Sequence, residues 1–425
     1  MQTIPQKVDL SKKSCLFYDN GLFIELAIKL SKTFGKVYYY NPWKSGFPKR
    51  NLAQVSMGVE GLENVLNFFD YVDQADLIVF PDVYDGDLQN FLVSKGYRVF
   101  GGRKGEDMEL NRDGMKRLMK RLNLPVNNYE VVKGIGNLRD YLKEHQNVYV
   151  KINTYRGEFE TFKCKTYKAI EPVLDQIEHN MGPMKYIQDF VVEDAIDDAV
   201  EVGYDGYCID GQFPTKSIAG IEIKDLGYIG KFMDYNKMSP LVTDFNDTIS
   251  PILKKYNYRG FMSSELRITK DKKPYMIDFC ARAGSPPNEV YQEVYTNLAE
   301  ICWYGADGIC IDPIVDHKYA LEVLVHSNWA DKNWQPVYFP KKYRDNIKFR
   351  NLTIINGVYY AVPQSVGLPE IGAIVAVGDS VDEVVDKVKE VAGQVEGYYI
   401  DIPLQSIDTA IEEAKKSEEI GVKII

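Results

Sequence analysis

Short apolar runs alternate with amphipathic segments along the first part of the chain. Apolar side chains dominate four runs that predict buried strands, at Ser14 to Tyr18, Lys36 to Tyr40, Leu77 to Phe80 and Tyr97 to Phe100. Between them, the apolar side chains from Leu22 to Leu30 share one helical face, and 87–94 predicts a short helix. Strands that alternate with helices are typical of a parallel, doubly wound sheet, so residues 1–108 are predicted to form an α/β Rossmann-like domain.

The turns of this predicted domain bear on what it binds. No G-x-G-x-x-G segment follows the first strand, so the turn that cradles a dinucleotide phosphate is missing. Open α/β sheets bind ligands beyond the carboxyl ends of their strands. The polar loops at these ends are the candidate wall for a second substrate, at Asp19 to Gly21, Asn41 to Lys44 and Pro81 to Asp87.

The pattern changes after a basic helical stretch at 111–123, which Leu124-Pro125 ends. Runs rich in β-branched and aromatic residues follow, at Tyr129 to Val132, Val148 to Ile152, Glu160 to Tyr167, Tyr186 to Val192, Val200 to Ile209 and Ser217 to Ile223. They predict an antiparallel α+β domain over 109–334. A strand at Gly372 to Val377 and a helix at Asp379 to Val391 predict a small α+β domain over 335–425.

Composition narrows the class of protein. The 425 residues are 45% apolar and 26% charged, which is ordinary for two or three globular domains. A formal net charge of −10 gives no basic field for nucleic acid. Six cysteines and four histidines show no zinc-ligand spacing, and no apolar run suits a signal peptide or a membrane span. We therefore expect a cytoplasmic protein without a structural metal.

Two carboxylates are candidates for a metal site. Glu265 and Asp278 fall on consecutive predicted strands joined by the polar turn Thr269 to Lys273, so a hairpin would bring them side by side. Mg²⁺ prefers carboxylate oxygens and shares its remaining positions with water and nucleotide phosphates. The alternative is that the two residues belong to a solvated face of the sheet.

Three cations lie where they could serve such a site. Arg267 shares a strand face with Glu265, although an ordinary cross-strand ion pair also explains it. Arg282 follows Asp278 by four residues and leads into a Gly-Ser-Pro-Pro turn, so it either meets charge forming beside the metal or lies on the surface. Lys151 stands inside an apolar strand and either meets an anionic phosphate or extends outward from an edge strand.

Two further segments suit a nucleotide. The turn between Thr154 and Thr161 contains Arg156 and Gly157 and could lie over phosphates through backbone N–H groups. The stretch Tyr186 to Val191 leads into an acidic run that contains Asp194 and Asp197. Such a hinge either offers backbone groups to an adenine edge and a carboxylate to ribose hydroxyls, or is a solvated loop.

Taken in order, these segments resemble the ATP-grasp superfamily, and within it most closely the phosphoribosylamine–glycine ligases. The clearest match is Ile277 to Pro286, IDFCARAGSP, which is similar to the family's I-E-F-N-C-R-F-G-D-P. The resemblance implies that Asp278 and Glu265 bind the metal and that Arg282 is catalytic. Cys280 stands where the family has a second metal ligand, an asparagine, and Ser285 stands where it has an aspartate near the amino-acid substrate.

The remaining matches assign nucleotide contacts. Arg112 occupies the position of the family's ATP-binding lysine, Lys151 matches its V-V-V-K strand, and Arg156 and Gly157 replace its glycine-rich phosphate loop. The family's I-E-E-F-L hinge resembles Ile187 to Val191, which assigns ATP contacts to Gln188, Asp189, Phe190 and Val191. Asp194 and Asp197 compete for the ribose. Lys224 lies in a segment similar to the family's K-D-x-G, near the substrates, and Ala376 to Val381 resembles its C-terminal A-L-G-D-T-V.

The resemblance implies an ATP-dependent ligase that forms an amide from a carboxylate and an amine through an acyl phosphate. It implies ATP and Mg²⁺ or Mn²⁺ as cofactors, with Lys224, Arg267 and Arg282 as catalytic residues and Glu265, Asp278 and Cys280 around the metal. The expected substrates are a small carboxylate, such as the amino acid glycine, and a small amine, bound by a monomer or homodimer. The alternative is a catalytically impaired nucleotide-binding protein, because a thiol is a poor Mg²⁺ ligand.

Overall fold

The N-terminal part of the chain forms a parallel sheet. The computed structural model describes residues 7–42, 55–155, 159–363 and 370–425. Within them, five parallel strands have the order β3-β2-β1-β4-β5, with β1 at Ser14–Tyr18, β2 at Lys36–Tyr40, β3 at Leu62–Val65, β4 at Leu77–Val79 and β5 at Val99–Phe100. The helices are α1 (Ile24–Ser31) and α2 (Gly86–Ser94). The predicted Rossmann-like fold is confirmed.

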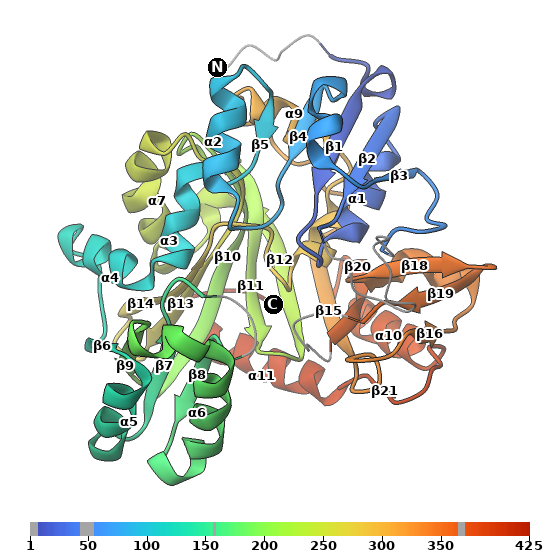
Figure 1. Cartoon of the computed structure of the whole chain (residues 1–425). Coiled ribbons are helices and arrows are strands. Elements are labelled where there is room, and N and C mark those ends of the chain that lie inside the picture. The colour runs from blue at the N-terminus through green and yellow to red at the C-terminus, as the bar shows by residue number, and fades with distance from the viewer. Residues whose placement is uncertain (1–6, 43–54, 156–158, 364–369) are drawn as a thin grey trace.

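A large antiparallel sheet forms the centre of the molecule (Figure 1). Its strands run in the order β14-β13-β10-β11-β12-β15-β20-β17, with β21 paired to β15. Their bounds are β10 Ala199–Ile209, β11 Lys216–Ile223, β12 Gly227–Asp234, β13 Arg259–Thr269, β14 Pro274–Cys280, β15 Tyr319–Ser327, β17 Ile347–Phe349, β20 Glu370–Gly378 and β21 Ile400–Asp401. The helices that accompany them are α7 (Pro240–Lys255), α8 (Asn288–Val294), α9 (Leu298–Ala306), α10 (Val381–Ala392) and α11 (Gln405–Glu419).

A small four-stranded sheet forms a separate lobe, at the lower left of Figure 1. Its order is β6-β9-β7-β8, with β6 at Tyr129–Lys133, β7 at Val148–Ile152, β8 at Thr161–Cys164 and β9 at Asp189–Asp194. Helices α5 (Ile135–Glu144) and α6 (Tyr167–Met181) pack against it around a core of its own, which includes Leu138, Val150 and Leu174. Two short helices, α3 (Asp107–Leu110) and α4 (Arg112–Arg121), connect the parallel sheet to this lobe.

The C-terminal residues contribute to two sheets. A three-stranded sheet has the order β16-β19-β18, with β16 at Gln335–Val337, β18 at Leu352–Ile355 and β19 at Val358–Ala361. The strands β17 and β20 instead extend the central sheet, because β20 pairs along almost the whole of β15. The predicted fold class, an α/β Rossmann-like part plus antiparallel α+β parts, is thus confirmed, while the domain boundaries at 108 and 334 stay predictions.

Candidate functional site

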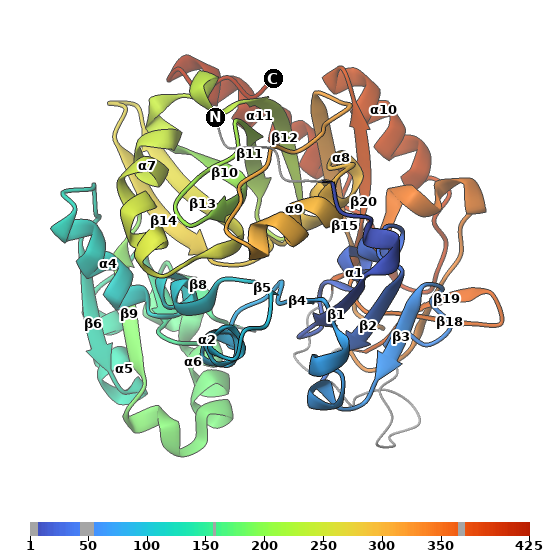
Figure 2. The same ribbon diagram turned by 90° about the horizontal axis from the view of Figure 1, so that it is seen from above.

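A cavity of about 350 Å³ lies where the small sheet meets the central sheet. Figures 1 and 2 both show the small sheet beside the β13–β14 edge of the central sheet. The charged side chains that line the cavity are Lys151, Glu160, Glu193, Asp194, Glu201, Glu222, Lys224, Asp225, Glu265, Arg267, Asp278 and Arg282. Half of the sixteen site residues predicted from the sequence line this cavity: Lys151, Asp194, Lys224, Glu265, Arg267, Asp278, Cys280 and Arg282.

Glu265 and Asp278 are direct neighbours across the β13–β14 hairpin, as predicted. Burial raises the pKa of Glu265 well above its usual value, and the nearby carboxylates of Glu222 and Asp278 raise it further. Burial also opposes ionisation of Asp278, but the positive charges of Lys151 and Arg112 outweigh it and hold the pKa of Asp278 below its usual value. Carboxylates that repel one another in a buried cavity favour a cation between them.

Lys151 is the buried cation nearest to this pair. It is 6% exposed, its Nζ donates to the carbonyl oxygen of Ile277, and Nζ lies 3.9 Å from Asp278 Oδ2. Burial alone would lower the pKa of Lys151, but attraction to Asp278 and Glu193 raises it. The ammonium group is therefore charged at the cavity wall, where it would meet an anion.

Arg282 and Cys280 line the same cavity as the carboxylate pair. Arg282 Nε donates to Glu109 Oε1 at 2.9 Å and lies 4.0 Å from Asp82 Oδ1, so residues of α3 and of the parallel-sheet loops hold the guanidinium. Cys280 Sγ lies 3.9 Å from Glu265 Oε1. Arg282, which was expected from the sequence to be catalytic, therefore lies against the loop after β4 that was expected to form the wall for a second substrate.

Lys224 and Arg267 complete the positive side of the cavity. Arg267 Nη1 lies 3.6 Å from Glu201 Oε2, and Nη2 donates to the carbonyl oxygen of Ala199. Arg267 thus forms the cross-strand ion pair that was one alternative for it, and it also lines the cavity, as the other alternative requires. Lys224 follows β11 and is exposed at the cavity wall. Within the described part of the chain it has no ion pair closer than 4.0 Å, which leaves its ammonium group available to an anionic ligand.

The hinge residues are placed differently from the expectation. Gln188, Asp189, Phe190 and Val191 lie at the start of β9 and do not line the cavity; Gln188 Nε2 instead donates to the carbonyl oxygen of Asn153. The other end of β9 lines the cavity, through Glu193, Asp194 and Ile196. Asp197 is also outside the lining, where Asn147 Nδ2 donates to it.

Arg112 and the turn after β7 were also predicted to contact the nucleotide. Arg112, 8% exposed, donates from Nη1 to the carbonyl oxygens of Ile152 and Tyr155, so it braces the chain on both sides of the turn after β7. Arg156 and Gly157 lie outside the described residues. Their contact with phosphates remains a prediction.

Sequence reasoning missed several residues of the site. Glu201 and Glu222 line the cavity from β10 and β11, and Asn127 lines it beside Lys116, a buried lysine of α4. Glu193, which the sequence marked only as the start of the acidic run after the hinge, lines it as well. Lys116 Nζ donates to Glu193 Oε2 at 2.9 Å and to Asn127 Oδ1 at 2.8 Å. In the sequence, Glu201 and Glu222 are marked only by a charge within a β-rich run.

The donor set suits a magnesium ion that is shared with a ligand. Within the described residues no group of three or more His, Cys, Asp or Glu side chains has the arrangement of a complete metal site. Mg²⁺ needs only one or two protein carboxylates when phosphates and water supply the rest, and Glu265 and Asp278 meet that need. The residues present therefore fit this ion.

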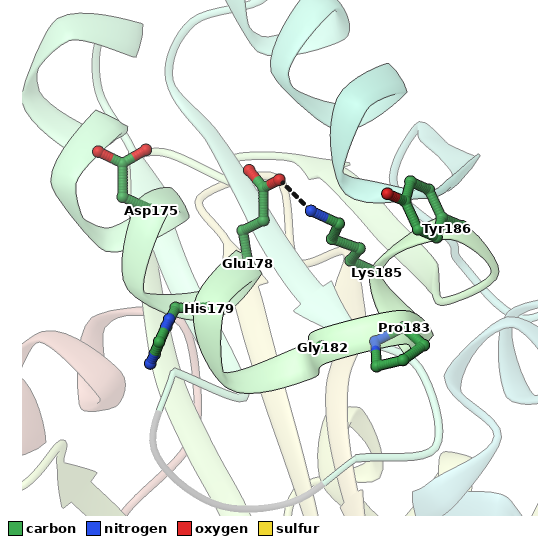
Figure 3. A pocket seen from close by; sticks show the side chains of 7 residues that line it. All are labelled: Asp175, Glu178, His179, Gly182, Pro183, Lys185 and Tyr186. Atoms are coloured by element: carbon green, nitrogen blue, oxygen red, sulfur yellow. Dashed lines mark hydrogen bonds and ion pairs between the residues drawn. The ribbon is translucent and has the colours of Figure 1, made fainter.

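A second depression, elsewhere on the surface, has a different character. It measures about 530 Å³ and lies at the end of α6 and the following turn. Glu178 and Lys185 form an ion pair there at 2.9 Å, which Figure 3 marks with a dashed line. Of the segments expected to contact a substrate or nucleotide, only Tyr186, the first residue of the predicted hinge, lines it. Among the described helices, none combines the length and the apolar character needed to span a membrane.

The arrangement of these sheets around the cavity is that of the ATP-grasp fold. Among similar solved structures is phosphoribosylamine–glycine ligase from Thermotoga maritima, with a TM-score of 0.65 and 16% identity over 92% of this chain and 98% of that one. Biotin carboxylase from Campylobacter jejuni reaches a TM-score of 0.65 with 14% identity, over 93% of this chain and 95% of that one. N5-carboxyaminoimidazole ribonucleotide synthetase from Thermotoga maritima reaches 0.59 with 13% identity, over 91% and 99%. No protein-family model and no curated protein sequence matches the chain.

Proposed function

We propose that the chain is an ATP-dependent carboxylate–amine ligase that works through an acyl phosphate. One observation carries this proposal: the Glu265–Asp278 pair faces the cations Lys151, Lys224 and Arg282 within one cavity. Paired carboxylates suit a metal-bound nucleotide, and converging cations suit the charge of a phosphate in transfer. The similar ATP-grasp structures are ligases and carboxylases, which supports the same general kind of reaction.

ATP would lie between the two sheets. The backbone from Glu193 to Ile196, at the cavity end of β9, would offer its polar groups to the adenine edge. Asp194 is favoured over Asp197 for the ribose hydroxyls because it lines the cavity. Lys151 would contact the phosphates, with Arg112 holding the backbone beside it. Glu265 and Asp278 would hold Mg²⁺ or Mn²⁺, which supplies neutralisation of phosphate charge when bound.

The chemistry follows from this placement. A carboxylate oxygen of the first substrate attacks the γ-phosphorus, the bond to the β-phosphate oxygen breaks, and ADP leaves. The amine nitrogen of the second substrate then attacks the acyl carbon, loses a proton, and expels phosphate to leave an amide. Lys224, Arg267 and Arg282 would stabilise the negative charge that forms in both steps.

The parallel-sheet loops would hold the amine against the cavity. Ala283 N donates to the carbonyl oxygen of Pro81 at 2.9 Å, which fixes the loop after β4 beside Arg282. Asn20 Nδ2 donates to Asp85 Oδ2 at 3.0 Å and so joins the loops after β1 and β4. We propose a small carboxylate, such as an amino acid of the glycine type, and a small amine as the substrate pair.

The experiment is to mix the protein with ATP, Mg²⁺ and a panel of amino acids and amines, and to measure ADP release. One pair of substrates should stimulate ADP release, and Asp278→Asn should abolish it, whereas Lys120→Met, an exposed change on α4, should retain it. ADP release from no mixture would refute the proposal.

Cys280 gives a specific reason to consider a second function, a nucleotide-binding protein with impaired catalysis. Its thiol lines the cavity 3.9 Å from Glu265 Oε1, where a poor magnesium ligand stands beside the metal carboxylates. Nucleotide binding without turnover that Cys280→Asn does not restore would favour this second function. Turnover by the unaltered chain would exclude it.

A further inference from the structure

A buried carboxylate, Glu193, lies between two buried lysines at the cavity. Its Oε2 accepts hydrogen bonds from Lys116 Nζ at 2.9 Å and from Asn127 Nδ2 at 3.2 Å. Its Oε1 has no hydrogen-bond partner in the described part of the chain and lies 3.8 Å from Lys151 Nζ. A hydrogen bond requires a shorter distance, so Glu193 attracts Lys151 without binding it.

Lys151 keeps donors for a ligand because of this arrangement. An ammonium group has three N–H donors, and among the residues that the structure describes Lys151 donates one hydrogen bond, to the carbonyl oxygen of Ile277. Asp278 is 3.9 Å away and Glu193 is 3.8 Å away, both outside hydrogen-bond distance. The ammonium group is thus surrounded by negative charge but remains free to turn toward a phosphate.

The charges of this group balance only as a set. Lys116 and Glu193 are each 3% exposed, and a buried charge is costly unless an opposite charge lies next to it. If Lys116 lost its charge, Lys151 would be the nearest cation to Glu193. The carboxylate would then be expected to form a direct ion pair with Lys151 and to draw it away from the cavity.

The same group also holds the backbone at the proposed adenine contact, from Glu193 to Ile196. Asn127 Nδ2 donates to the carbonyl oxygen of Asp194 at 3.0 Å as well as to Glu193. Asn127 in turn accepts a hydrogen bond from Lys116. One buried lysine therefore acts on both the base and the phosphate sides of the cavity without lining it.

We infer that Lys116 is a positioning residue for the nucleotide: by holding Glu193, it keeps that carboxylate from capturing the phosphate-binding Lys151. The inference rests on the proposed nucleotide site. Lys116 touches neither the ligand nor the reacting atoms, and acts through Glu193 and Asn127.

The test is calorimetric titration of the full chain with ATP in the presence of Mg²⁺. Lys116→Met should weaken binding about tenfold or more, a loss on the scale of one charged hydrogen bond, whereas Lys116→Arg should largely retain affinity. Lys120→Met is the matched control, since it makes the same change at an exposed position one turn further along α4 and should bind as the unaltered chain does.

The double variant Lys116→Met with Glu193→Gln separates positioning from packing. It removes one charge of each sign and leaves Lys151 with Asp278, so it should bind ATP more tightly than Lys116→Met alone. If Lys116 acted only through packing, Glu193→Gln would weaken ATP binding further when added to Lys116→Met. If Lys116→Met does not fold, Lys116→Gln replaces it, because the amide still donates to Glu193 but carries no charge.

The outcomes distinguish this inference from the proposed function. Failure of the unaltered chain to bind ATP would overturn both. Binding that neither Lys116→Met nor Lys116→Gln weakens, or a double variant no better than the single one, would overturn only the role of Lys116.

Discussion

Replacing Glu106 by glutamine should reduce the pH dependence of stability, because this carboxyl group is buried in the parallel-sheet domain. Glu106 ends a short 3-10 helix at Arg103–Glu106 and is 3% exposed. Burial raises the pKa of Glu106 to about 8, although hydrogen bonds from the backbone N–H of Gly86 and from Gln89 oppose the rise. The negative charges of Asp85 and Asp82 add to the effect of burial.

The sign follows from which state holds the proton. In the unfolded chain the carboxyl group ionises with a pKa near 4.5, whereas in the folded chain it keeps its proton up to about pH 8. Between these values the folded state binds more protons, so stability falls as the pH rises. The gap corresponds to about 5 kcal/mol, at about 1.4 kcal/mol per pH unit, once the pH exceeds both values.

Urea unfolding from about pH 5 to about pH 8 measures this effect in the unaltered chain and in Glu106→Gln. The glutamine keeps the shape of the protonated acid, so the variant should lack this one contribution while every other titrating group is shared. Relative to the unaltered chain, the variant should gain about 4 kcal/mol between these two pH values. Parallel pH profiles for the two proteins would refute the reasoning that Glu106 is held protonated by the fold.

Three further changes probe the fold and the site. Arg344→Met should lower the free energy of unfolding, measured with denaturant, by about 3 kcal/mol, because the buried Glu25 loses the guanidinium that lies 2.8 Å away. The double variant Arg344→Met with Glu25→Gln should lose less, because no unpaired charge is then buried. Leu174→Ala should lower the stability of the small-sheet lobe by about 2–5 kcal/mol, because it leaves a cavity in that core. Amide hydrogen exchange should become faster in the small sheet than in the parallel sheet, and equal exchange in both would contradict the prediction. Asp278→Asn should abolish the rise in melting temperature that Mg²⁺ and ATP together produce in the unaltered chain, and an unchanged rise would remove Asp278 from the metal site.

Local patterns predicted the elements well where neighbours in sequence are also neighbours in space. The hairpin of Glu265 and Asp278 needed only two apolar strands and the polar turn between them, and its register pairs the two carboxylates directly. The parallel strands were equally clear: the three central residues of β1, Cys15 to Phe17, are apolar and buried because the strand is covered on both faces. Lys151 was recognisable because a charge within an apolar strand needs a partner.

Contacts between distant segments left little trace in the sequence. Lys116 sits in a helix with several other basic residues, and its partner Glu193 is 77 positions away, so nothing local distinguishes it. The hinge shows a second difficulty, because a strand has two ends and only one reaches the cavity. Pairing of Lys151 with Val191 and of Tyr149 with Glu193 decides that end, and this register depends on tertiary structure.

The charge balance of the cavity bears on the most conspicuous departure from the family pattern. Among the described lining residues, eight carboxyl groups face four cations, and burial together with repulsion between the acids raises the pKa of Glu222 and Glu265. More negative charge is therefore unfavourable here, and an ATP molecule without its metal would add it. Burial raises the pKa of Cys280, so the thiol stays protonated and neutral, as the asparagine in the resembling family would be. The substitution therefore removes an oxygen ligand but changes no charge. A metal held by Glu265 and Asp278, with phosphate oxygens to complete its shell, is the arrangement that this balance favours.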